Sequence, residues 1–299
     1  MSATFAAVDW GSSSFRLWLL DADGTVLAER RSDEGLLHGA ERGFAAILAA
    51  HLAATGAADD LPVLICGMAG AREGWIEAPY LDIPGSLAGL AAHAVRVPGS
   101  RDIRILPGLA QRHPRPDVMR GEETQLAGLA AAGDTGIVCM PGTHCKWVTL
   151  DGNRVEGFRS AMTGELFALL SRASSLRHAA APRPADPRAP AFLAAIDRGL
   201  ADPAGLSLDL FGIRAGRLLD AHPPEEGADR LSGLLIGAEL GAALARTPGG
   251  TVTLVSQGGL GPLYAAALRR AGRTVVERDA EDITRHGLIA AARDIWEFA

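Results

Sequence analysis

The sequence predicts an α/β protein built from two copies of one unit. Near its start, an apolar strand leads through a small-residue turn into a second apolar strand, and an Asp-Gly turn leads into a third. The same order of elements returns about 130 residues later, which indicates a duplicated domain. We therefore expect two domains, residues 1–133 and 134–299, each made of a sheet with helices.

The first copy is expected to open with three strands, because apolar residues dominate the segments on either side of the turns. A helix follows, since Phe44, Ile47, Leu48 and Leu52 recur at helical spacing. The expected elements are strands at 5–8, 15–20 and 25–30, a helix at 41–54, strands at 62–66 and 103–106, and a helix at 122–131.

The second copy repeats this beginning and then becomes mostly helical. Its Ala/Pro/Arg-rich stretch at 178–190 is typical of a surface loop. The expected elements are strands at 135–140, 145–150 and 154–159, helices at 164–173, 191–199, 206–219 and 229–246, a strand at 251–255, a helix at 262–271, a strand at 274–276 and a helix at 280–296.

Composition narrows the class of protein. Of the 299 residues, 48% are apolar and 21% are charged, as in a soluble globular protein. The net charge of −6 argues against nucleic acid or an anionic membrane as a partner. No signal peptide or membrane span is expected, and Cys66, Cys139 and Cys145 fit buried thiols in a reducing cytoplasm. The oligomeric state stays open, with a homodimer as one candidate.

The first turn carries an acid at the end of an apolar strand. Gly11, Ser12 and Ser13 offer backbone N–H groups and hydroxyls with little steric bulk, which suits a phosphate. Asp9 stands where a hydrated Mg²⁺ on that phosphate would sit, so it would hold the metal through water. The alternative is an ordinary hairpin with a polar tip.

The second turn occupies the equivalent place in the second copy. Gly142 and Thr143 could bind a phosphate, flanked by His144 and Lys146. Lys146 is the one lysine among 29 basic residues, which hints at a role that arginine does not fill. Two such turns could grip a triphosphate from both sides, although a polar hairpin again remains the alternative.

A cation and two acids gather where a helix is expected to begin. Glu122 or Glu123 could be the general base for a substrate hydroxyl, and Arg120 could bind an anionic substrate. Acids in the first turn of a helix also complement its dipole, so a purely structural role stays open.

Weaker candidates complete the set. Gly258 and Gly259 follow a buried strand and permit the close approach of a flat ligand such as adenine, or simply begin a helix. Trp75 lies in an aromatic loop that could line a sugar site or pack inward. Thr163 and Glu165 are candidates for substrate contacts, and could equally cap a helix and complement its dipole.

Five segments of this sequence closely resemble the 2-dehydro-3-deoxygalactonokinase family, within the wider actin-like ATPase and sugar-kinase superfamily. The resemblance spans nearly the whole chain, and the second to fourth segments are the specific ones. The segments are 8–13 (VDWGSS), 118–125 (VMRGEETQ), 140–147 (MPGTHCKW), 162–166 (MTGEL) and 231–239 (LSGLLIGAE).

The resemblance implies two ribonuclease H-like domains with a nucleotide cleft between them. It also implies an enzyme that uses ATP and Mg²⁺ to phosphorylate the 6-hydroxyl of 2-dehydro-3-deoxy-D-galactonate in galactonate breakdown. Phosphate and substrate binding would fall to the N-terminal domain, and the second phosphate turn and adenosine to the C-terminal one. The alternatives are a kinase of the same fold for another small keto acid or amino sugar, and a nucleotide-gated regulatory protein.

Overall fold

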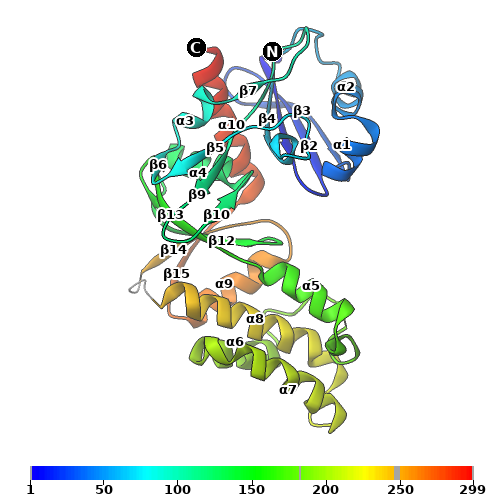
Figure 1. Ribbon diagram of the computed structural model, residues 1–299, viewed down its shortest axis with the longest axis vertical. Helices are drawn as coiled ribbons and strands as arrows, with labels where there is room; N and C mark the ends of the chain where they lie inside the picture. The colour runs from blue at the N-terminus through cyan, green and yellow to red at the C-terminus, as the bar shows by residue number, and fades with distance from the viewer. Residues whose placement is uncertain (1, 182, 246–249, 298–299) are drawn as a thin grey trace. The chain divides into compact units, whose positions relative to one another are not determined.

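The computed structural model describes residues 2–181, 183–245 and 250–297, which form two compact units (Figure 1). The first unit holds the described residues of Met1–Thr135, Leu150–Gly157 and Ala280–Ala299, and the second those of Gly136–Thr149 and Phe158–Asp279. Pro182, in the predicted loop, and Arg246, the predicted end of one helix, lie outside the described residues.

The first unit is built on a sheet with the strand order β3-β2-β1-β4-β8-β7. β1 to β3 are joined as antiparallel hairpins, whereas β4 lies parallel to β1 and β8 parallel to β4. The bounds are β1 Phe5–Trp10, β2 Phe15–Leu20, β3 Val26–Ser32, β4 Val63–Gly67, β7 Val95–Arg96 and β8 Ile103–Ile105.

The helices of this unit bury apolar residues against the sheet. α1 (Leu36–Arg42) and α2 (Phe44–Ala54) take the place of the single helix predicted at 41–54, because Gly43 adopts a φ of 89° and breaks the helical run. Trp10 of β1 packs edge-on against Phe15, with ring centroids 4.8 Å apart. The other helical elements are η1 Met68–Gly70, α3 Gly89–Ala92, α4 Glu122–Ala131 and α10 Ala280–Trp296.

A small sheet with the order β10-β9-β5 was not predicted from the sequence. Its strands are too short to show an alternating pattern: β5 is Tyr80–Ile83, β9 is Gly108–Gln111 and β10 is Asp117–Met119. β10 ends one residue before Arg120, so this sheet positions the start of α4.

A second sheet repeats the strand order of the first sheet. Its strands run β15-β14-β11-β12-β13, matching β8-β4-β1-β2-β3, and β14 is again parallel to both neighbours. The bounds are β11 Gly136–Met140, β12 Cys145–Asp151, β13 Arg154–Ala161, β14 Thr251–Ser256 and β15 Thr274–Asp279, and β6 Gly85–Ser86 pairs with the start of β13. The shared order confirms the predicted duplicated α/β fold.

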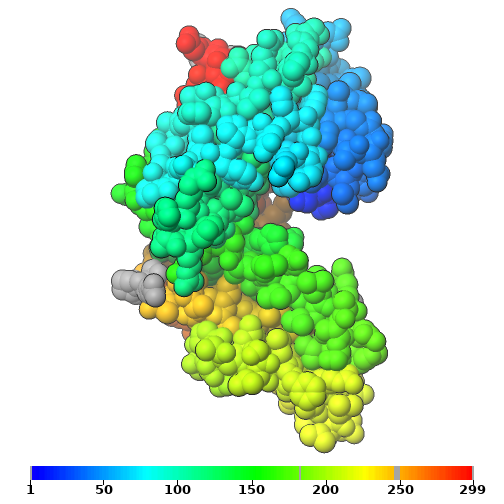
Figure 2. Space-filling view, viewed as in Figure 1, coloured from blue at the N-terminus to red at the C-terminus, as the bar shows by residue number. Residues whose placement is uncertain are grey.

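Helices make up most of the second unit. α6 and α8 approach closely at glycines: a Cβ on Gly237 would lie 2.5 Å from the carbonyl oxygen of Ile196. α7 exposes Leu208, Phe211 and Leu218. The segment that holds α7 lies in the yellow-green part of the molecule in Figure 2. The bounds are α5 Thr163–Ala173, η2 Ser175–His178, α6 Pro190–Ala201, η3 Pro203–Gly205, α7 Leu206–Leu218, η4 Pro224–Glu226, α8 Gly227–Leu244 and α9 Leu260–Arg270. None of the described helices has the length and apolar character needed to span a membrane.

The last helix belongs to the first unit. α10 packs against α4 through two glycines: a Cβ on Gly128 would lie 2.1 Å from the Ile283 carbonyl oxygen, and one on Gly287 would lie 1.9 Å from that of Thr124. The predicted boundary after residue 133 lies close to the first crossing at Thr135, but the second unit ends at Asp279 and does not run to residue 299. Close packing of two small-residue faces, which spacing along the chain does not reveal, accounts for this difference.

Candidate active site

Asp9 lies in β1, which continues to Trp10 and so extends two residues beyond the predicted strand. It faces Arg16 of β2 and Cys66 of β4 in the sheet register. Arg16 Nη1 donates to Asp9 Oδ2 at 3.2 Å, and Cys66 Sγ lies 3.9 Å from Oδ1. Burial raises the pKa of Asp9 above its ordinary value, although the positive charge of Arg16 acts to lower it. With 19% of its side chain exposed, Asp9 can still meet a hydrated ligand.

The predicted phosphate turn, Gly11–Ser13, is a tight connection between β1 and β2. The Gly11 N–H donates to the Ser14 carbonyl oxygen at 2.8 Å, and the Leu36 N–H donates to the carbonyl oxygens of Gly11 and Ser12 at 3.1 Å. A Cβ on Gly35 would lie 2.4 Å from the Ser12 carbonyl oxygen, so the start of α1 supports the turn directly. Ser12 and Ser13 remain exposed.

The start of α4 comes close to Asp9 through a glycine at the end of β4. Gly67 has a φ of 88°, and a Cβ there would lie 3.6 Å from Asp9 Oδ1. A Cβ on Gly121, just before α4, would lie 3.6 Å from the Gly67 Cα. The first unit thus brings Asp9 and the start of α4 to neighbouring positions, because Gly67 at the end of β4 lies close to both Asp9 and Gly121.

The two candidate bases have different surroundings. Glu122 is half-buried, and its Oε2 accepts the Arg120 N–H at 3.1 Å. Glu123 is fully buried at 0% exposure, and its Oε2 accepts the Gly121 N–H at 2.6 Å. Burial and the charge of Glu122 raise the pKa of Glu123 to about 8. Glu123 is therefore largely protonated at neutral pH, while Glu122 has access to solvent.

The raised pKa of Glu123 predicts a pH-dependent stability. Between its ordinary pKa of 4.5 and its folded pKa of about 8, the folded protein holds a proton that the unfolded chain releases, so stability falls as pH rises. Glu123→Gln should remove this loss, which amounts to at most about 5 kcal/mol because one pKa unit equals about 1.4 kcal/mol. Urea unfolding at pH 4.5 and pH 9 measures the loss of stability, and Glu41→Gln, at an exposed position, is the control. If the free energy of unfolding of Glu123→Gln fell with pH as much as that of the wild type, the raised pKa of Glu123 would be contradicted.

The Arg120 guanidinium stacks on an aromatic ring and uses part of its hydrogen-bonding capacity. Its Cζ lies 4.4 Å from the centroid of the Tyr80 ring, and its Nη2 donates to the Ala78 carbonyl oxygen at 2.8 Å. Its Nε and Nη1 are buried and have no hydrogen-bond partner among the described residues. A guanidinium held in this way retains the capacity to bind an anion.

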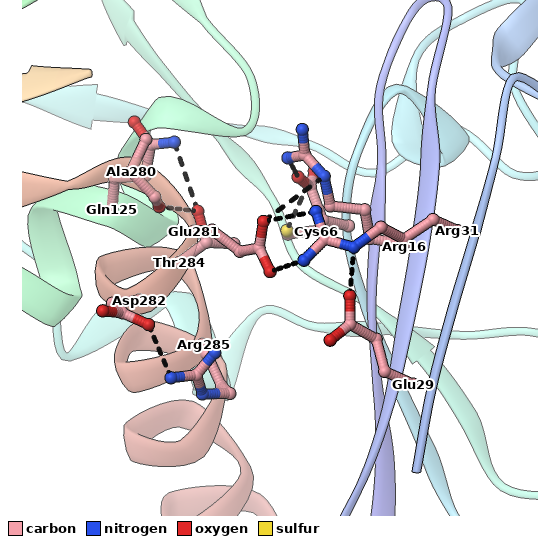
Figure 3. A network of polar contacts seen from close by, with 11 residues as sticks. Arg16, Glu29, Arg31, Cys66, Gln125, Ala280, Glu281, Asp282, Thr284 and Arg285 are labelled. Carbon is pink, nitrogen blue, oxygen red and sulfur yellow. Dashed lines mark hydrogen bonds and ion pairs between the residues drawn. The ribbon is translucent and has the colours of Figure 1, made fainter. Parts of the chain in front are cut away.

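Glu281 was missed by the sequence reasoning. It lies in the first turn of α10 and faces Arg16, with Arg16 Nε 3.9 Å from Glu281 Oε2 (Figure 3). Its charge is one of the influences that raise the pKa of Asp9. Two acidic residues at 281–282 stand at the start of a predicted helix. Nothing in the neighbouring sequence linked them to Asp9, which lies more than 270 positions earlier.

Trp75 packs against two aromatic rings of the first unit. Its ring stacks on Phe44 at a centroid distance of 6.2 Å and meets Trp10 edge-on at 6.4 Å. It is partly buried against the apolar core of the first unit.

In the second unit, the predicted phosphate turn meets the start of α5. A Cβ on Gly164 would lie 2.4 Å from the Gly142 carbonyl oxygen, and the Glu165 N–H donates to the Thr143 carbonyl oxygen at 3.0 Å. His144 Nε2 lies 2.6 Å from Glu165 Oε2. Lys146 is 5% exposed on β12. The residues of the turn and of α5 therefore form one structural unit.

A cavity of about 500 Å³ opens beside this turn, wholly within the second unit. Gly142, Thr143, Thr163 and Glu165 line one side of it, and Gly259 at the start of α9 lines another. Side chains such as Phe167, Leu235, Ile236, Leu263 and Tyr264 make the walls largely apolar. Gly258 precedes Gly259 with a φ of 69°. One cavity is thus lined by residues predicted to contact phosphate, by residues predicted to contact substrate, and by one of the two glycines predicted to lie against adenine.

The comparisons with known proteins agree with one another. The profile of the 2-keto-3-deoxy-galactonokinase family matches residues 9–291. A Rhizobium meliloti (strain 1021) protein described as a probable 2-dehydro-3-deoxygalactonokinase is 53% identical over 300 residues, covering 98% of this chain and 97% of the relative. The 2-dehydro-3-deoxygalactonokinase of Escherichia coli (strain K12) is 41% identical over 241 residues, 80% of each chain.

Solved structures support the fold. A 2-dehydro-3-deoxygalactonokinase-type protein from Sinorhizobium meliloti superposes with a TM-score of 0.93 at 52% identity, covering 99% of this chain and 98% of the other. The activator of the 2-hydroxyisocaproyl-CoA dehydratase from Clostridium difficile has a TM-score of 0.51 at 13% identity, over 98% of this chain and 96% of the other, so that likeness concerns the fold alone.

Proposed function

We propose that this chain, which belongs to the 2-keto-3-deoxy-galactonokinase family, transfers the γ-phosphoryl group of ATP to the 6-hydroxyl of 2-dehydro-3-deoxy-D-galactonate. The observation that carries the proposal is the meeting of Asp9, Gly67 and the Gly121–Glu123 segment at one edge of the first sheet. Phosphoryl transfer needs positioning and charge stabilisation more than covalent chemistry, and this edge offers an acid, an open turn and a candidate base together.

In the first unit, the Gly11–Ser13 turn would bind phosphate oxygens through the N–H groups and hydroxyls of the exposed Ser12 and Ser13, while the Gly11 N–H holds the turn by donating to the Ser14 carbonyl oxygen. Glu122 would take the proton of the acceptor hydroxyl, since its half-buried carboxylate has access to solvent. Buried Glu123 would hold the start of α4 through its hydrogen bond with the Gly121 N–H.

The residues present fit a magnesium ion carried by the nucleotide. No group of three His, Cys, Asp or Glu side chains in the described part of the chain could hold a metal alone, and Mg²⁺ in kinases relies on one or two carboxylates, water and phosphate. Asp9, partly exposed beside the turn, would hold the hydrated ion. When bound, the ion neutralises charge on the phosphate oxygens.

The second unit would hold the nucleotide. Its largely apolar cavity of about 500 Å³ suits a base and ribose. Gly142 and Thr143 would bind phosphate at one end of the cavity, and Gly259 would lie against adenine. His144 and Lys146 would assist phosphate binding, and Gly258 adenine binding, from positions next to these residues in the chain, outside the cavity lining. Thr163 and Glu165 line the same cavity, which supports a contact with nucleotide or substrate there.

Arg120 would bind the carboxylate of the keto acid. Two of its buried nitrogens have no acceptor among the described residues, so an arriving carboxylate would supply one. Trp75 would support the neighbouring core. Cys66, Cys139 and Cys145 are free and buried, which suits work in the reducing cytoplasm.

A coupled assay of ADP release tests the function. Purified protein is mixed with ATP and Mg²⁺, and ADP is followed after adding the galactonate-derived or the gluconate-derived keto-deoxy acid. Rapid release with the galactonate-derived acid alone is expected. Release with neither acid would reject the kinase function, and a preference for the other acid would correct the substrate.

Filling the cavity predicts a selective loss of nucleotide binding. A Cβ on Gly259 meets no heavy atom within 4 Å, so Gly259→Leu can be accommodated while occupying space beside the cavity. The KM for ATP should rise about tenfold, which corresponds to about 1.4 kcal/mol, because the leucine side chain would take up space that the nucleotide needs, while the KM for the keto acid stays unchanged. Gly212→Leu on exposed α7 is the control; equal effects of the two variants on the KM for ATP would contradict the assignment.

A further inference from the structure

Residues 183–186 are tied to the first turn of α8 by one buried carboxylate, that of Asp229. Asp229 Oδ2 accepts from Arg183 Nη2 at 2.6 Å, and Asp229 Oδ1 accepts from the Asp186 backbone N–H at 2.8 Å. The side chain of Asp229 is 6% exposed, whereas that of Arg183 is 39% exposed. Both oxygens of a buried acid therefore hold this segment of the Ala/Pro/Arg-rich loop.

The 183–186 segment forms part of the wall of the cavity that we assign to the nucleotide. Arg183, Pro184 and Ala185 all line this cavity. Arg183 Nη1 also donates to the Pro184 carbonyl oxygen at 2.8 Å, and Arg183 Nη2 donates to the Glu225 carbonyl oxygen. The guanidinium that Asp229 holds therefore fixes the backbone of the wall as well as its own position.

The chain on either side of this segment is fixed without Asp229. A Cβ on Gly227 would lie 1.7 Å from the Ala179 carbonyl oxygen, so the start of α8 packs directly on the chain before the segment. After the segment, α6 begins at Pro190. Loss of the Asp229 contacts should therefore loosen the 183–186 segment and leave these flanking anchors in place.

We infer that Asp229 is a positioning residue for the proposed reaction: by holding the 183–186 segment, it fixes one wall of the cavity for the nucleoside of ATP before the nucleotide binds. The inference rests on the proposed function. Pro184 and Ala185 have apolar side chains, which suit the flat face of a base. Fixing the wall in advance removes the entropy cost of ordering it from the free energy of nucleotide binding.

Two substitutions of Asp229 should weaken ATP binding to different degrees. Asp229→Asn keeps one oxygen that can accept the Asp186 N–H, but its amide nitrogen cannot accept from Arg183. Asp229→Ala removes both anchors. We expect the KM for ATP to rise about threefold in Asp229→Asn and about tenfold in Asp229→Ala, which for the alanine corresponds to about 1.4 kcal/mol. The KM for the keto acid and kcat at saturating ATP should stay within about twofold of the wild type, because bound nucleotide orders the wall again.

An ion pair at the same end of α8 supplies the matched control. Glu226 precedes α8, its Oε2 lies 2.6 Å from Arg230 Nη2, and neither residue is among those that line the cavity. Glu226→Gln removes one negative charge and one ion pair while the contacts of Asp229 stay in place. It should leave the KM for ATP within about twofold of the wild type, because partly exposed ion pairs contribute little.

Steady-state kinetics with ATP and the keto acid varied in turn measure these constants, and calorimetric titration of ADP into the full chain measures nucleotide affinity directly. ADP should bind most tightly to the wild type, less tightly to Asp229→Asn and least tightly to Asp229→Ala. Thermal unfolding is recorded for each variant, since a purely structural role would lower Tm without changing the KM for ATP. An unchanged KM for ATP in Asp229→Ala, an equal rise in the KM for the keto acid, or the same rise in Glu226→Gln would overturn the inference.

If Asp229→Ala does not fold, the contact can be tested from its other side. Arg183→Gln and Asp229→Asn disrupt the same ion pair, so the double variant should raise the KM for ATP no further than the larger single effect. Single effects that multiply in the double variant, or a wild-type KM for ATP in both single variants, would overturn the inference. If the wild-type chain neither binds ADP nor phosphorylates the keto acid, the proposed function has failed. The positioning role fails separately, when the wild type is active and the Asp229 variants keep its KM for ATP.

Discussion

Asp9→Asn should reduce kcat by about 100- to 1,000-fold, the range found when one preorganised charge-stabilising group is removed from an active site. The amide keeps the shape of the carboxylate but carries no charge to hold a hydrated cation against the phosphates. Arg16 or Cys66, which donate to different oxygens of Asp9, can still donate to the one amide oxygen, so the fold should persist. Steady-state ADP release measures the loss, and circular dichroism confirms that the variant is folded.

A control variant at another acidic residue of the same hairpin shows whether the loss of kcat is specific to Asp9. Asp23→Asn lies in the exposed turn after β2 and removes the same charge from the same hairpin. It should leave kcat within about twofold of the wild type, because exposed charges are screened by solvent and salt. Turnover by Asp9→Asn near the wild-type rate would show that Asp9 has no role at the metal.

The fold could be predicted well where the signal was local. The small-residue turns and the Asp-Gly turns fix the hairpins of both copies, and the matching strand orders follow from the same pattern. The small β10-β9-β5 sheet could not be foreseen, because its strands have three or four residues each. The placement of α10 in the first unit depends on the contacts of Gly128 and Gly287 across more than 150 residues.

The sequence predicted separate residues of the candidate site but not how they lie together. Asp9 and the Gly121–Glu123 segment were both candidates from the sequence, but their proximity arises from the register of β1 with β4 and from the conformation of Gly67. The distinction between Glu122 and Glu123 depends on burial, which neighbouring acids in a sequence do not reveal. Glu281 shows the same limit, because its link to Arg16 exists only in the folded chain.

Glu122→Gln should lower kcat by about 100- to 10,000-fold, the usual contribution of a positioned general base. The loss should appear in kcat with little change in the KM for ATP, since Glu122 belongs to the first unit and is not among the residues that line the cavity of the second unit. Glutamine can still accept the Arg120 N–H, so the start of α4 should be preserved. Single-turnover measurements of phosphorylated product separate this loss from effects on product release.

Glu123→Gln is the matched comparison, because it makes the same chemical change one residue further along α4. A carboxyl with a pKa of about 8 is largely neutral at pH 7, so an amide of the same size resembles the form already present. Its kcat at pH 7 should remain within about tenfold of the wild type, the difference reflecting the rearranged hydrogen bond with the Gly121 N–H. A larger loss in Glu123→Gln than in Glu122→Gln would reverse the two roles, and wild-type rates in both would place the base elsewhere in the chain.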